Sequence, residues 1–138
     1  MGTTEIRRIL KDGVDTPVEV DGDELVAEDG WRIPIHEAHH LPPVRPTKIL
    51  CVHLNHISRV REFQTTLPAA PTYFHKPVSS LNRHLGDVVR PERCRWLNYE
   101  GEVVIVIGQP CRNIAPAAAG HYISGYTSSA RRRLRQGR

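Results

Sequence analysis

The chain has 138 residues and a formal net charge of +4 at pH 7, a length that suits one domain but not two separate cores. Five arginines lie within residues 131–138, and without them the formal charge would be about −1, so the basic excess belongs to the C-terminal end. This distribution disfavours a nucleic-acid-binding domain, although the arginines could attract phosphate non-specifically.

Three cysteines, without a C-x-x-C pair, indicate reduced thiols and an intracellular setting. No apolar run is long enough to cross a bilayer, and the N-terminus lacks the pattern of a signal peptide. We therefore expect a cytoplasmic protein with no membrane partner.

Residues 1–40 predict a small antiparallel β unit. Its short alternating segments are separated by Asp-Gly pairs, which are strong turn signals. The expected strands are Ile6 to Leu10, Pro17 to Val20, Glu24 to Ala27 and Trp31 to Ile33. His39 and His40 follow and are expected on the surface, and residues 41–46, with three prolines, predict a stiff extended linker.

Residues 41–127 predict a second region that is mainly β. It begins with a buried strand at Lys48 to Val52, and Ser58 is expected to cap a short helix. The later expected elements are a strand at 72–75, a long strand at 102–107, a helix that starts near Pro116 and a return strand at 123–127. Residues 128–138 have one large apolar side chain and predict a flexible, disordered tail.

Glu100 and Glu102 are the most informative pair in the sequence. They precede an apolar, β-branched run that predicts a strand buried on both faces. Side chains two apart in a strand point to the same side, so two carboxylates would project together. A hard divalent cation such as Mg²⁺ or Mn²⁺ would relieve their repulsion. The alternative is a solvated strand end whose two acids face water.

Several strings in order resemble the fumarylacetoacetate hydrolase family over residues 41–127. They are Lys48 to Asn55, Tyr73 to Ser80, Leu97 to Gly108, Cys111 to Ile114 and Gly125 to Thr127. The sequences around His56 to Phe63 and Thr72 to Lys76 are most similar to those of the isomerases that act on 2-hydroxyhepta-2,4-diene-1,7-dioate or 5-carboxymethyl-2-hydroxymuconate.

The resemblance implies a mainly β (α+β) fold, a mixed β-roll, that holds Mg²⁺ or Mn²⁺ with acidic side chains. The metal ligands would be Glu100 and Glu102, and the catalytic residues would be Lys76 beside the substrate and Glu62 on a lid helix. We assign substrate contacts to Asn55, Arg59 and Tyr126. The implied reaction is isomerisation, or carbon–carbon hydrolysis, of a dicarbonyl dicarboxylic acid from aromatic catabolism.

Departures from the family pattern affect the metal and the lid. The family's third metal ligand is an Asp, but the corresponding position carries Arg131, whose guanidinium would repel a cation. Arg59 stands where many members have a histidine, and the family's domain continues for many more residues, so the resemblance implies a C-terminally truncated catalytic domain.

Simpler roles remain open for these residues. Lys76 could be a solvated cation at a strand end, and Glu62 could be a surface charge paired with Arg59 three residues earlier. His53 and His56 could suggest zinc, but no third ligand follows them, so we favour loop histidines. The sequence contains neither a Gly-x-Ser-x-Gly nucleophile motif nor a glycine-rich phosphate loop.

The sequence therefore supports two alternative functions. One is a metal-dependent isomerase or hydrolase that binds a small dicarboxylate and forms a homodimer or higher homo-oligomer. The other is a non-catalytic fragment of such an enzyme that acts as an oligomer-forming or interaction module, because missing strands would leave edges open to pairing.

Overall fold

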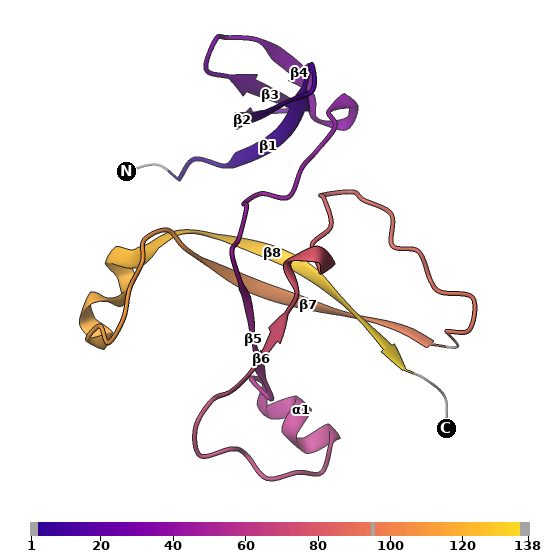
Figure 1. Cartoon of the computed structure of the whole chain (residues 1–138), viewed down its shortest axis with the longest axis vertical. Helices are drawn as coiled ribbons and strands as arrows, with labels where there is room; N and C mark the ends of the chain where they lie inside the picture. The colour runs from indigo at the N-terminus through magenta and orange to yellow at the C-terminus, as the bar shows by residue number, and fades with distance from the viewer. Residues whose placement is uncertain (1–2, 95, 136–138) are drawn as a thin grey trace. The chain divides into compact units, whose positions relative to one another are not determined.

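The computed structural model describes residues 3–94 and 96–135, which form a mainly β structure built from antiparallel strand pairs (Figure 1). The chain divides into two units, Met1–Gly86 and Asp87–Arg138, and each is described by itself. The predicted mainly β class is confirmed. No helix among the described residues combines the length and the apolar character that a membrane crossing requires.

Four strands form the N-terminal sheet in the order β1 (Ile6–Lys11), β2 (Val14–Asp21), β3 (Glu24–Ala27) and β4 (Arg32–Pro34). Asp12 and Gly13 join β1 to β2 with φ of 51° and 80°, the positive pair that a two-residue hairpin turn needs. The 3₁₀ helix η1 (Ile35–Glu37) follows β4. These strands match the predicted ones within a few residues at each end.

The core of this sheet consists of a few apolar side chains on one face. Ile9, Val18, Leu25 and Ala27 are buried together, and Val20, Trp31, Ile33, Ile35 and Ala38 pack around them. The alternation of the strands places these residues on the same side. A polar residue closes the core: His40 is only 2% exposed and its backbone pairs with Ile9. The prediction that His40 lies on the surface is therefore wrong, because its bridge to β1 draws it under the sheet.

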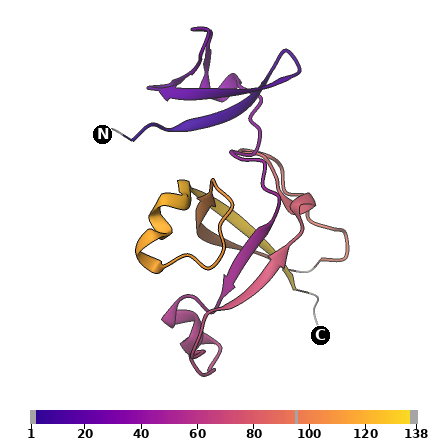
Figure 2. The same cartoon turned by 60° about the vertical axis from the view of Figure 1, so that its left-hand side comes forward.

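The middle of the chain forms a second hairpin with a helix in its connection (Figure 2). β5 (Ile49–His53) pairs with β6 (Thr72–Lys76), and α1 (Ile57–Glu62) lies between them in the sequence. The residue that precedes α1 is His56, which makes no side-chain capping bond, so the predicted Ser58 cap is wrong and Ser58 lies inside the helix. The 3₁₀ helix η2 (Val78–Ser80) follows β6.

The second unit is a long antiparallel ribbon. β7 (Trp96–Ile107) pairs with β8 (Ile123–Arg135), and the 3₁₀ helix η3 (Pro116–Tyr122) lies in their connection (Figure 1). The predicted disordered tail over 128–138 differs from this structure, in which β8 continues through Arg135. Continued backbone pairing with β7 orders these residues, although their side chains offer little apolar surface. Residues 136–138 lie outside the described residues.

The apolar half of β7 is not buried on both faces, so that prediction is wrong for this chain. Val104 and Val106 are partly buried, but Tyr99, Val103, Ile105 and Ile107 on the other face are exposed. A two-stranded ribbon has no second layer to cover both faces, which leaves one apolar face open.

Candidate metal centre

Glu100 and Glu102 lie on the same face of β7, as the alternation of the strand predicts. Both are partly buried, together with Val104 and Val106, whereas Gly101, which separates them, is exposed. Neither carboxylate is free of interactions. A Cβ built on Gly101 would meet nothing within 4 Å, so space is open on the far side of the pair.

The strand pairing shows what the ladder places opposite the two acids. Glu100 lies directly across from Arg131, and Glu102 lies across from Ser129. The position that carries an arginine instead of the family's aspartate is thus the cross-strand partner of Glu100.

The donor set fits a hard divalent cation by type but is incomplete. Carboxylate oxygens are the preferred protein ligands of Mg²⁺ and Mn²⁺. No cluster of three or more His, Cys, Asp or Glu side chains suited to a metal occurs among residues 3–94 and 96–135. Glu100 and Glu102 could therefore supply two ligands, with water or substrate oxygens at the remaining positions.

Asn55 lies just before the short helix α1 of the first unit, and Arg59 and Glu62 lie within that helix. Leu54 precedes Asn55 with φ of 53°, a strained conformation for leucine that turns the chain sharply into the helix. Nη1 of Arg59 donates a hydrogen bond of 2.6 Å to Oε2 of Glu62. The i, i+3 pairing of these two residues agrees with the simpler role considered for Glu62.

Lys76 ends β6 and lies across from Ile49. It is partly buried, like Phe74 two residues earlier, whereas His75 between them is exposed. Its ammonium makes no hydrogen bond or ion pair with any residue that the structure describes. A cation on a half-buried face without a counter-ion can receive an anionic ligand.

Tyr126 lies on β8 across from Ile105, and its side chain is 69% exposed. It belongs to the open apolar face of the ribbon, which is the face opposite Glu100 and Glu102 along β7. Within the second unit, the structure therefore separates Tyr126 from the two acids.

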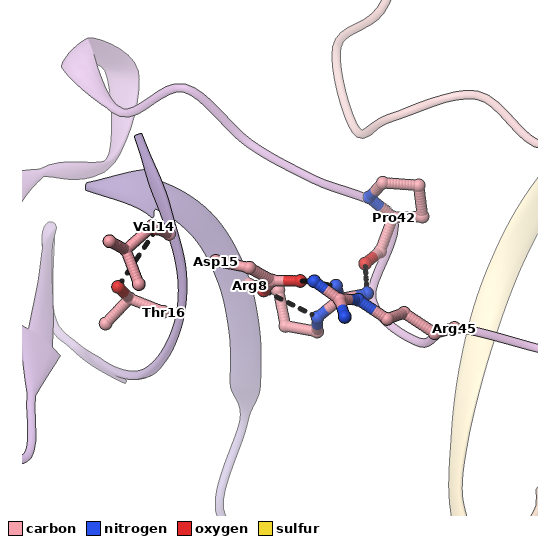
Figure 3. Close-up of polar contacts among 6 residues, drawn as sticks. All are labelled: Arg8, Val14, Asp15, Thr16, Pro42 and Arg45. Carbon is pink, nitrogen blue, oxygen red and sulfur yellow. Dashed lines mark hydrogen bonds and ion pairs between the residues drawn. The ribbon is translucent and has the colours of Figure 1, made fainter. Parts of the chain in front are cut away.

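Sequence reasoning missed a polar cluster in the first unit (Figure 3). Asp15 on β2 accepts hydrogen bonds from both Arg8 on β1 and Arg45 in the proline linker. Nη1 of Arg8 also donates a hydrogen bond of 2.8 Å to the carbonyl oxygen of Pro42. These bonds hold the linker against the sheet. Arg8 and Arg45 are 37 positions apart in the chain, and no local pattern signals that they share a carboxylate.

Similarity to known proteins agrees with the resemblance found in the sequence. Residues 48–131 match the family profile described as fumarylacetoacetate (FAA) hydrolase C-terminal, which covers more than half of the chain. The chain belongs to the fumarylacetoacetate hydrolase family. The matched segment includes β5 to β7 and ends within β8, at Arg131.

Relatives include isomerases, decarboxylases and tautomerases of this family. An uncharacterised protein of Archaeoglobus fulgidus is 38% identical over 79% of this chain and 43% of its own. The 4-hydroxyphenylacetate degradation bifunctional isomerase/decarboxylase of Salmonella dublin is 28% identical over 92% of this chain and 30% of its own.

Among solved structures, 5-carboxymethyl-2-hydroxymuconate delta-isomerase from Mycobacterium smegmatis superposes with a TM-score of 0.73. It is 25% identical and aligns with 94% of this chain and 54% of its own. The predicted resemblance to the fumarylacetoacetate hydrolase family and its isomerase branch is thus confirmed. The chain spans less than half the length of the curated relatives it matches. Enzymes of this family generally use divalent metal ions.

Proposed function

We propose that this chain carries the metal-binding part of a site that isomerises, or hydrolyses, dicarbonyl dicarboxylic acids derived from aromatic compounds, with Mg²⁺ or Mn²⁺ as cofactor. The observation that carries the proposal is the placement of Glu100 and Glu102 on one partly buried face of β7. The activities for which the Salmonella dublin and Mycobacterium smegmatis relatives are named support the substrate class.

The proposal gives each residue a chemical role. Glu100 and Glu102 would hold the ion, which acts as a Lewis acid on substrate oxygens when bound. The ammonium of Lys76, which has no counter-ion in the described chain, would orient a substrate carboxylate. Glu62 would move a proton, and Arg59, its hydrogen-bond partner, would hold it in position. Asn55 would contact the substrate.

One observation favours a second function without catalysis. Arg131 stands where the family has an aspartate that would serve as a third metal ligand, and the register places this residue across from Glu100. A residue that carries a positive charge supplies no ligand to a cation. A chain with that charge could retain the strand pairing while binding no metal. It would then act as an interaction module of the same family.

Metal binding and turnover distinguish the two functions. We expect Mn²⁺ to bind the chain in calorimetry, and 5-carboxymethyl-2-hydroxymuconate to be converted only when Mg²⁺ or Mn²⁺ is present. Glu100→Gln and Glu102→Gln should each lower turnover by about a hundredfold or more, because even partners outside the ligand shell cost roughly 10- to 100-fold. Arg131→Asp should tighten Mn²⁺ binding by about tenfold or more, since added ligand charge raises affinity.

Glu92→Gln is the matched control, because Glu92 lies in the same unit, is exposed and belongs to no strand. It should leave both metal binding and turnover unchanged. Absence of metal heat and of metal-dependent turnover would overturn the enzymatic proposal. A gain of Mn²⁺ binding in Arg131→Asp alone would then assign the second function to the natural chain.

We also propose that the chain assembles as a homodimer or higher homo-oligomer. The open face of the ribbon carries the exposed apolar side chains of Tyr99, Val103, Ile105, Ile107 and Tyr126. Exposed apolar residues that lie together on one face mark interaction sites more often than scattered ones do. A two-stranded ribbon is marginal in water without a packed face. A second copy presents the same apolar face and could cover it through a two-fold contact.

A further inference from the structure

The ring of His40 is oriented by a hydrogen bond, as is typical of a histidine that binds a metal ion. Its Nε2 lies 2.9 Å from the carbonyl oxygen of Ile35. A carbonyl oxygen only accepts hydrogen bonds, so Nε2 is the donor, and in the neutral imidazole Nδ1 then carries a lone pair. Histidines that ligate metals usually donate their other ring N–H to a carbonyl or carboxylate in this way.

The Nδ1 atom of His40 is buried and unsatisfied. It has no hydrogen-bond partner in the part of the chain that the structure describes. Leaving a buried acceptor without a partner costs free energy, and such an atom calls for an explanation. The backbone holds the residue in place, because Leu10 N–H bonds to His39 and Leu41 N–H bonds to Arg8 on either side of it.

The imidazole ring of His84 lies beside the ring of His40. The ring centroids of His40 and His84 are 4.9 Å apart, and their planes are perpendicular. With Zn–N bonds of about 2.0 to 2.1 Å, two imidazoles on one tetrahedral ion have centroids roughly 5 Å apart. The observed spacing matches that value. His84 is exposed and lies in the loop that follows η2.

We propose that His40 and His84 form a binding site for a borderline-soft transition metal ion such as Zn²⁺, completed by water. Imidazole nitrogen suits zinc, copper and nickel but not Mg²⁺, so this site is chemically distinct from the carboxylate pair on β7. Both histidines belong to the first unit. Metal binding would tie the loop that carries His84 to the core of the N-terminal sheet.

The charges near the pair allow a cation to bind. Burial lowers the pKa of His84, and the neighbouring His40 and Arg7 lower it further, while Glu5 acts in the opposite direction. Arg7 would repel a cation, but its guanidinium is paired with Glu5 at 2.8 Å, which offsets its charge.

Cobalt spectroscopy tests this site in the full, untagged chain at neutral pH. Co²⁺ bound by imidazoles should give a visible absorption band that Zn²⁺ displaces, and the NMR signals of the His40 and His84 rings should be the ones that Co²⁺ shifts. We expect His84→Ala to weaken Zn²⁺ binding by about tenfold or more. His84 is exposed, so this variant should retain the fold.

His39→Ala is the matched control, since His39 is exposed and adjacent to His40 in the sequence. It should leave Zn²⁺ affinity unchanged, and so should the double variant Glu100→Gln, Glu102→Gln, which separates this site from the one proposed for Mg²⁺. An unchanged affinity in His84→Ala, an equal loss in His39→Ala, or the absence of the cobalt band would each overturn the proposal.

Discussion

Asp15 shows how much a single carboxylate can organise in this chain. It receives hydrogen bonds from Arg8 and Arg45, and its side chain is only 18% exposed. The Arg8 hydrogen bond holds the pKa of Asp15 below its usual value of 3.8, with Arg45 adding to the effect against the cost of burial. The hydrogen bonds from Arg8 and Arg45 therefore hold the linker in place and also stabilise the ionised form of Asp15 in the folded state.

Replacing Asp15 should make stability less dependent on acid pH. A carboxyl group whose pKa is lower in the folded state than in the unfolded state stabilises the fold above its unfolded pKa, and this contribution disappears as the pH falls through the folded pKa. We expect Asp15→Asn to lower the thermal midpoint at pH 7. The difference from the natural chain should shrink below about pH 4.

Circular dichroism melts between pH 7 and pH 2.5 measure this difference. Asp23→Asn provides the control, because Asp23 is exposed and its side chain makes no hydrogen bond or ion pair with a described residue. A constant difference between Asp15→Asn and the natural chain over the whole range would contradict the electrostatic account.

At the scale of elements, the N-terminal sheet is stabilised by a small core. Leu25 is fully buried in β3 and lies across from Val20 and Ile33 on the neighbouring strands. Leu10 on β1 is 40% exposed. Both are leucines in the same sheet, so the pair isolates the effect of burial on the free energy of unfolding.

Leu25→Ala should lower the free energy of unfolding by about 2 to 5 kcal/mol, because it leaves a cavity in a packed core. Leu10→Ala should cost less than about 1 kcal/mol. Urea unfolding in a Trp96→Phe background would follow the fluorescence of Trp31, which packs against this core. Equal losses in both variants would show that burial in this sheet does not determine its stability.

At the scale of the whole molecule, the open face of the ribbon is the surface through which we propose that copies of the chain associate. Val103 on that face and Val89 in the preceding loop are both about equally exposed, at 83% and 84%. Only Val103 belongs to a continuous apolar strand face. The two valines therefore separate exposure as such from membership of the proposed interface.

Val103→Glu should weaken self-association by about tenfold or more, because a charge would be buried at a dry contact. Val89→Glu should leave self-association unchanged. Sedimentation velocity at several protein concentrations measures both. A natural chain that stays monomeric at all concentrations would exclude the proposed assembly.

The sequence by itself predicted the local structure well wherever local chemistry decides it. Asp-Gly pairs located the hairpins of the N-terminal sheet, and β-branched runs located β5 and β7. Alternation in β7 placed Glu100 and Glu102 on one face, because side-chain direction in a strand depends only on position. The ordered sequence segments within residues 41–127 also identified the family, whose profile matches residues 48–131.

Tertiary structure decided what depends on partners distant in the chain. Backbone pairing with β7 ordered the arginine-rich segment through Arg135 and set Arg131 across from Glu100. A bridge to Ile9 buried His40 beside His84, and Asp15 joined two arginines far apart in the sequence. Burial and pairing arise when segments meet in space, and the local pattern of residues does not encode that meeting.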